Sequence, residues 1–225
     1  MAFTAADVKT LREMTSVGMM DCKKALVECD GDMDKAVEWL REKGLAKAAK
    51  KADRVAAEGV AFATVVDGVG VVIEVNSETD FAAKTDAFMD LVKNLAAVVA
   101  TENPADVDAL KACKYPGSNL TVTEIMQEKV MSIGENMQIR RFVRFSENTS
   151  VGYVHAGGKI GVLVNLAVDG GIDATEIAKD VAMQAAAMAP ISISREDCDP
   201  AVIEHERSIG REQARLDGKP EAMLD

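Results

Sequence analysis

Residues 69–75 read VGVVIEV, and residues 160–166 read IGVLVNL. Each is an apolar, strand-like run that follows a turn signal, Asp67-Gly68 in the first case and Gly157-Gly158 in the second. Each is also followed by a helical pattern that a proline closes. The similarity indicates an internal repeat of two β-hairpin-plus-helix units. We therefore expect an α+β protein whose core has two related parts built on antiparallel sheets.

The two copies differ where the strand passes into the helix. Residues 76–84, NSETDFAAK, follow the first strand, and the first copy is the longer one overall. We expect much of the extra length to lie in this connection. Ser77-x-x-Asp80 fits a capping box, which is a purely structural interpretation. A cap needs no extra residues, because Asp173 caps the second helix without them, so the extra length favours a functional role.

Phe81 has two possible positions in this connection. It lies seven residues before Phe88, so a helix that already ran through Phe81 would turn its ring toward the core. If the helix begins only near Asp86, the ring is free to face solvent. The spacing alone leaves both positions open.

The N-terminal region, residues 1–44, is expected to fold as three short helices. Thr4 with Asp7 makes a capping box, Gly31-Asp32 separates the second helix from the third, and Gly44 is expected to end the third. Residues 45–57 form a basic linker, helical in part, and carry Lys47, Lys50, Lys51 and Arg54. Such a run is usually a solvated face, but in an acidic protein it also suits an acidic partner.

The remainder divides into three parts. Residues 58–135 are expected to form one core subdomain, and residues 136–217 the other. Residues 218–225 are expected to begin a further C-terminal helical part that this chain lacks. Thr121-x-x-Glu124 predicts a capped helix before the boundary between the subdomains.

Composition excludes several classes of function. The chain has 225 residues and a formal net charge of −11, which argues against direct, non-specific nucleic-acid binding. It has no apolar run of membrane-spanning length and no signal pattern, so a soluble protein of the cytoplasm is expected. The four cysteines form no CxxC pair, so neither a metal site nor a disulfide framework is indicated. No nucleotide-binding loop or hydrolase motif is present, and no cofactor is expected.

The residues alone leave two further hypotheses open. One is a helical adaptor that binds a partner without changing it. The other is a small enzyme that uses Asp80 and His155 as an acid–base pair, which requires the two side chains to share a pocket.

Together, five segments resemble the translation elongation factor Ts family. They are LREMTSVGMMDCKKAL (residues 11–26), AKAAKKA (46–52), EVNSETDFAAK (74–84), IGENMQIRR (133–141) and the hairpin from Tyr153 to Val164. The resemblance implies that the first three helices form a ubiquitin-associated-like domain. It also implies a guanine-nucleotide exchange factor, not an enzyme, whose partner is the GDP-bound GTPase elongation factor Tu. The sequence leaves open whether the chain forms a homodimer.

The resemblance also implies which residues contact the partner. In the family, the TDF segment enters the GTPase near its nucleotide and disturbs the magnesium ion; here that segment is Thr79, Asp80, Phe81 and Ala82. The family often has valine where this chain has Ala82. Further partner contacts are carried over to Met19, Met20, Lys23, Lys51, Gly134 and His155. With this reading, Phe81 is expected to be exposed.

Overall fold

Three helices at the N-terminus pack around a small apolar core. In the computed structural model, which describes residues 3–15 and 17–221, they are α1 (Ala5–Thr15), α2 (Met19–Glu28) and α3 (Met33–Lys51). Thr4 and Asp7 form the expected reciprocal cap, and Asp32 accepts a hydrogen bond from the Lys35 amide at 3.1 Å. The buried residues of this bundle are Val8, Leu11, Val17, Cys22, Ala25, Leu26, Ala36 and Leu40.

The sequence predicted that the third helix ends at Gly44, but α3 continues to Lys51. Gly44 is buried, and a Cβ atom placed on it would lie 3.2 Å from the Met131 sulfur. Met131 belongs to α7 (Val122–Ile133), and Arg41 of α3 also pairs with Glu128 of α7. The glycine is therefore a point of close helix–helix approach and not a helix terminator.

A three-stranded antiparallel sheet forms the centre of the fold. Its strands are β1 (Glu58–Val66), β2 (Val69–Ser77) and β3 (Met137–Phe145), in the order β1-β2-β3. Asp67 and Gly68 turn the chain between β1 and β2 with φ of 50° and 82°, as the Asp-Gly signal predicts. Val71, Ile73 and Val75 on one face are fully buried beneath α5 (Asp86–Glu102).

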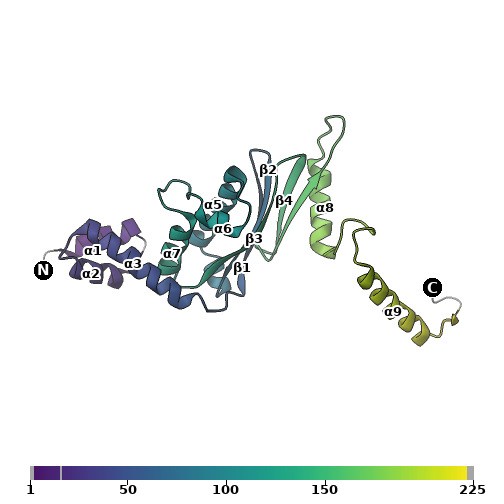
Figure 1. Cartoon of the computed structure of the whole chain (residues 1–225), viewed down its shortest axis with the longest axis horizontal. Helices are drawn as coiled ribbons and strands as arrows, with labels where there is room; N and C mark the ends of the chain where they lie inside the picture. The colour runs from purple at the N-terminus through teal and green to yellow at the C-terminus, as the bar shows by residue number, and fades with distance from the viewer. Residues whose placement is uncertain (1–2, 16, 222–225) are drawn as a thin grey trace. The chain divides into compact units, whose positions relative to one another are not determined.

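Two further helices complete this core. They are α6 (Val107–Ala112) and α7, and both contribute to the apolar cluster that α5 and the sheet share. The capping box of Thr121 with Glu124 is present, with both reciprocal hydrogen bonds. Figure 1 shows α5, α6 and α7 on one side of the sheet and the next hairpin on the other side.

That second hairpin consists of β4 (Thr149–His155) and β5 (Ile160–Leu166). Gly152 lets it approach β1 closely, because a Cβ atom there would lie 2.8 Å from the Ala63 backbone. The Ala61 amide also donates to the Gly158 carbonyl at 2.7 Å, which fixes the hairpin turn beside the start of β1. The expected α+β fold with antiparallel sheets is confirmed.

The chain divides into two compact units, residues 1–186 and 187–225. Helix α8 (Thr175–Met188) follows β5, and α9 (Pro200–Leu216) belongs to the second unit. Residues 1, 2, 16 and 222–225 lie outside the described residues, and the last four are half of the segment 218–225 that was expected to begin a further helical part. Among the described helices, none has both the length and the apolar character of a membrane span.

The strand-to-helix connections of the two repeats are equally long. Residues 78–85 link β2 to α5, and residues 167–174 link β5 to α8, eight residues in each case. The expectation that the first connection is longer is therefore wrong. Much of the extra length of the first copy lies in its helix, since α5 has 17 residues and α8 has 14.

Candidate functional site

The first connection folds into a single helical turn, α4 (Asp80–Ala83). Thr79 caps it, because the hydroxyl oxygen accepts a hydrogen bond from the Ala82 amide at 3.2 Å. At the other end the Thr85 hydroxyl donates to the Ala82 carbonyl at 2.8 Å and also caps α5. We call residues Thr79–Lys84 the α4 turn.

Phe81 projects from the α4 turn into solvent. Its ring is 81% exposed, whereas Ala82 and Ala83, the next two residues, are buried. The chain breaks helical geometry between α4 and α5, so Phe81 and Phe88 do not share a face. The continuous helix that would have buried Phe81 is absent, and the prediction of an exposed ring is confirmed.

The sequence pattern suggested that Ser77 caps the helix, but the structure shows that it does not. It is fully buried, and its hydroxyl donates to the Thr79 carbonyl at 2.9 Å. Ser77 therefore fixes the backbone that leads into the α4 turn, while Thr79 supplies the cap.

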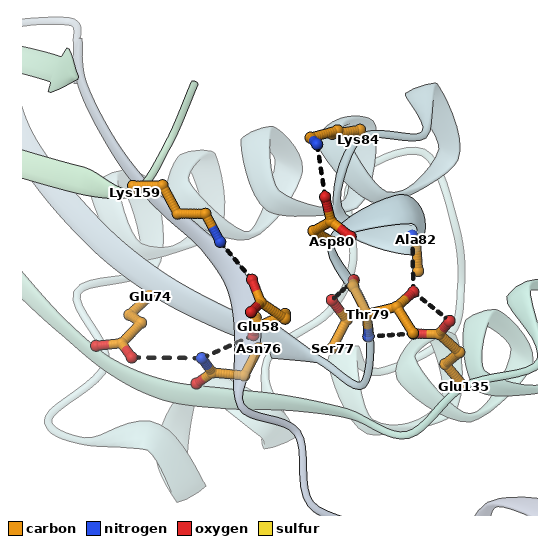
Figure 2. A network of polar contacts seen from close by, with 10 residues as sticks. All are labelled: Glu58, Glu74, Asn76, Ser77, Thr79, Asp80, Ala82, Lys84, Glu135 and Lys159. Atoms are coloured by element: carbon orange, nitrogen blue, oxygen red, sulfur yellow. Dashed lines mark hydrogen bonds and ion pairs between the residues drawn. The ribbon is translucent and has the colours of Figure 1, made fainter. Parts of the chain in front are cut away.

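Asp80 forms an ion pair with Lys84 at the outer surface of the α4 turn. The distance from the Asp80 carboxylate to Lys84 Nζ is 2.6 Å, and this hydrogen bond lowers the pKa of Asp80 below its ordinary value. Lys159, which pairs with Glu58, contributes a smaller effect in the same direction. Figure 2 shows Lys159 on the same side of the strand as Asp80. Both lysines favour the ionised form of the Asp80 carboxylate, Lys84 the more strongly.

Glu135 holds the α4 turn from a distant part of the chain (Figure 2). Its two carboxylate oxygens accept from Thr79, one from the hydroxyl at 2.6 Å and one from the backbone amide at 2.9 Å. Glu135 lies in the segment IGENMQIRR, in which only Gly134 was predicted to contact the partner. Nothing in the local pattern indicates a contact across 56 residues.

Asn136 ties the same region to the end of α3. It is only 4% exposed, and its side-chain amide donates to the carbonyls of Ala52 and Arg54 at 3.2 and 2.8 Å. Its backbone amide donates to the Glu78 carboxylate at 2.6 Å. Arg54 also pairs with Glu78, at 3.5 Å. Three chain segments thus meet beneath the α4 turn.

Comparison with known proteins gives a consistent assignment. The family model described as "Elongation factor TS" matches residues 78–225. Elongation factor Ts of Trichlorobacter lovleyi is 50% identical over 235 residues, covering 100% of this chain and 76% of the relative. Elongation factor Ts of Paracoccus denitrificans is 50% identical over 230 residues with the same coverage. This chain belongs to the elongation factor Ts family.

The resemblance drawn from the sequence is thereby confirmed, and it places the chain among the translation elongation factors. Of the residues carried over from the family, Ala82 is buried, so its methyl group packs inside the molecule. Phe81 is exposed, Asp80 is partly exposed, and Thr79 is partly buried with its hydroxyl bound to Glu135.

Two other family positions contact each other. The Lys51 ammonium donates to the Gly134 carbonyl, and Gly134 ends α7 in a left-handed conformation with φ of 91°. Partial burial lowers the pKa of Lys51. In this conformation Lys51 therefore joins the end of α3 to the turn before Glu135.

Family positions on α2 are exposed. Met20 is 76% and Met19 45% accessible, and Lys23 follows one turn after Met19. Methionines on an exposed helix start are adaptable apolar contacts for a partner. This group lies in the N-terminal bundle, away in sequence from the α4 turn.

His155 ends β4 in an exposed position, where its Nδ1 lies 2.9 Å from the Tyr153 hydroxyl. The hydrogen bonds of His155 and Asp80 go to Tyr153 and Lys84, so no described hydrogen bond joins the pair that an enzyme would need. The described residues also contain no cluster of three or more side chains that could hold a metal ion.

Proposed function

We propose that this chain is a guanine-nucleotide exchange factor for elongation factor Tu and acts in the cytoplasm during translation elongation. The observation that supports this most directly is Phe81, a large apolar ring held in water at the tip of a fixed helical turn. A ring in that position loses favourable burial in the free protein and regains it when a partner encloses it. Membership of the elongation factor Ts family supplies the partner.

Phe81 and Asp80 enter the GTPase beside its bound nucleotide in this mechanism. The magnesium ion of the GTPase bridges phosphate oxygens and protein ligands, so displacing it removes much of the affinity for GDP. The exchange factor performs no covalent step and is not an enzyme in the chemical sense. Because linkage is reciprocal, nucleotide weakens the factor's binding as much as the factor weakens nucleotide binding, and the factor leaves when GTP binds.

Other surfaces hold the partner while the α4 turn acts. Met19, Met20 and Lys23 provide an apolar and basic contact from the N-terminal bundle, and His155 provides one from the second hairpin. Lys51 and Gly134 contribute by fixing the base of the α4 turn.

The test is the rate at which fluorescent GDP leaves elongation factor Tu. The double variant Asp80→Ala/Phe81→Ala should lose most of the acceleration while its circular dichroism and unfolding midpoint stay near those of the parent. An unchanged release rate in the double variant would contradict the role of the α4 turn. Binding of the parent chain to the GTPase without faster release would instead support a simple adaptor.

A further inference from the structure

We propose that Glu135 is a positioning residue that holds the α4 turn with Phe81 facing outward and thereby sets the maximal exchange rate. The inference rests on the proposed function, since it assigns Glu135 to the same surface. Its evidence is the set of contacts between residues 78–79 and residues 135–136, which lie far apart in the sequence and side by side in the fold.

A helix of four residues cannot hold its shape unaided. Forming a first helical turn fixes several backbone angles for one hydrogen bond, so short helices depend on contacts from outside. Ala82 and Ala83 anchor one side of α4 by burial, but the side that carries Asp80 and Phe81 faces solvent. The entry of the turn at Thr79 therefore decides where the ring points.

Glu135 and Glu78 form a reciprocal clamp at this entry. The Glu135 carboxylate accepts from the Thr79 amide at 2.9 Å, and the Glu78 carboxylate accepts from the Asn136 amide at 2.6 Å. The last paired residues of β2 and β3 are Ser77 and Met137. The clamp thus extends the antiparallel ladder past its end, with side-chain carboxylates in place of backbone carbonyls.

Glu135 also orients the Thr79 hydroxyl. That hydroxyl donates to Glu135 at 2.6 Å, which leaves its lone pair free to accept from the Ala82 amide at 3.2 Å. If the hydroxyl proton turned elsewhere, both the helix cap and the clamp would weaken together. One carboxylate therefore controls the amide, the hydroxyl and, through the cap, the first turn of α4.

The experiment uses Glu135→Gln in the full chain. Glutamine keeps the size of the side chain but replaces one carboxylate oxygen with an NH2 donor, so one of the two Thr79 donors loses the oxygen that it now faces. Glu102→Gln is the matched control, because Glu102 is exposed at the end of α5 and the charge change is identical. Release of fluorescent GDP from elongation factor Tu is measured over a range of factor concentrations.

We expect Glu135→Gln to lower the maximal release rate roughly tenfold, since a hydrogen bond to a charged group is lost. The half-saturating concentration should change less than twofold, because the remaining partner contacts are intact. In the free variant, amide hydrogen exchange from Thr79 to Ala83 should be roughly tenfold faster. In a Phe81→Ala background, Glu135→Gln should lower the rate by less than about twofold more. Glu102→Gln should match the parent in every measurement.

Three results separate the two proposals. If Phe81→Ala slows release and Glu135→Gln does not, the positioning role is wrong and the proposed function stands. If Glu135→Gln lowers the rate as strongly with Phe81→Ala as without it, Glu135 acts elsewhere and the positioning role is again wrong. If neither variant affects release, the proposed function itself fails.

Thr79→Val provides a second route if Glu135→Gln unfolds. It removes the hydroxyl that joins Glu135 to the cap and leaves the Glu135 carboxylate in place. A folded Thr79→Val protein with an unchanged maximal rate and unchanged amide exchange in α4 would overturn the proposal.

Discussion

The connections after β2 and after β5 occupy equivalent places in a repeated unit and have the same length, yet they differ in structure. Residues 78–85 fold into a capped helical turn held by Glu135. Residues 167–174 form bends with two glycines, Gly170 and Gly171, at φ of 74° and 68°. Both connections expose an apolar side chain, Phe81 in the first and Ile172 in the second.

The contrast indicates how the connection proposed to contact the partner differs from its counterpart in the repeat. The first connection has no additional residues, but it has partners from two other chain segments, residues 135–136 and Arg54. In the second, the hydrogen bond that precedes α8 is local, from the Thr175 amide to Asp173 at 3.0 Å. Both connections expose an apolar side chain but, among the described residues, only in the first do contacts from other segments hold the backbone that carries it.

The largest expected effect concerns the two exposed apolar residues. Phe81→Ala should slow GDP release from elongation factor Tu by about tenfold or more, because truncating a central aromatic contact costs on the order of 2 kcal/mol. Ile172→Ala, the matched control, should stay within about twofold of the parent. Equal losses in the two variants would show that apolar exposure alone is sufficient.

The next prediction concerns the buried Asn136, which links the first connection to the end of α3. Asn136→Ala removes two hydrogen bonds to the end of α3 and should lower the free energy of unfolding by about 2 kcal/mol, measured by urea denaturation. Gln138→Ala, at an exposed position of β3, is the control and should change it by less than about 0.5 kcal/mol. Similar values for both would mean that the tie beneath the α4 turn contributes nothing to stability.

Substitution of a glycine tests the conformation of the second connection. Gly171 has a positive φ and open space around its Cα, so Gly171→Ala should destabilise the fold by about 1 kcal/mol through backbone strain alone. Thermal unfolding of the variant measures this cost. An unchanged midpoint would show that the second connection is not held in this conformation.

The smallest effect is a difference in titration between Asp80 and Asp173. Both have a lowered pKa, Asp80 through its hydrogen bond with Lys84 and Asp173 through hydrogen bonds from Thr175. A lowered folded-state pKa means that each carboxylate stabilises the fold above about pH 4 and loses this contribution as the pH falls through the folded pKa.

Salt should distinguish the two carboxylates, because the Asp80–Lys84 ion pair is exposed. About 0.5 M NaCl should raise the pKa of Asp80 toward its ordinary value and leave that of Asp173 nearly unchanged. Lys84→Ala should also raise the pKa of Asp80. Carbon-detected NMR titration of the carboxyl groups measures both, and an equal salt response would contradict the assigned causes.

Local signals allowed much of the fold to be predicted from the sequence. The Asp67-Gly68 turn, the Thr4–Asp7 cap and the Thr121–Glu124 capping box each depend on neighbours within four residues. Gly44 was misread because its role depends on Met131, a residue of another helix. A glycine looks the same in sequence whether it ends a helix or admits a neighbour.

The candidate site likewise has features that the sequence predicted and features that it could not predict. The exposure of Phe81 followed from the family resemblance, because the spacing from Phe88 left both positions open. In the structure Thr85 caps a new helix, so the two rings do not lie on one helical face. Glu135 and Asn136 could not be predicted, because their contacts with Thr79 and Glu78 join segments more than 50 residues apart. Hydrophobic periodicity carries no information about such polar contacts.

Gly44 also offers a spectroscopic handle on the N-terminal bundle. The chain has a single tryptophan, Trp39, which lies on α3 five residues before Gly44 and has Lys43 Nζ 5.3 Å from the centre of its ring. A Cβ atom at position 44 would lie 3.2 Å from the Met131 sulfur, so a bulkier residue there would require Met131 or α3 to shift. Because Trp39 packs against the apolar cluster of the bundle, its intrinsic fluorescence can report on the packing of the bundle in the unlabelled protein.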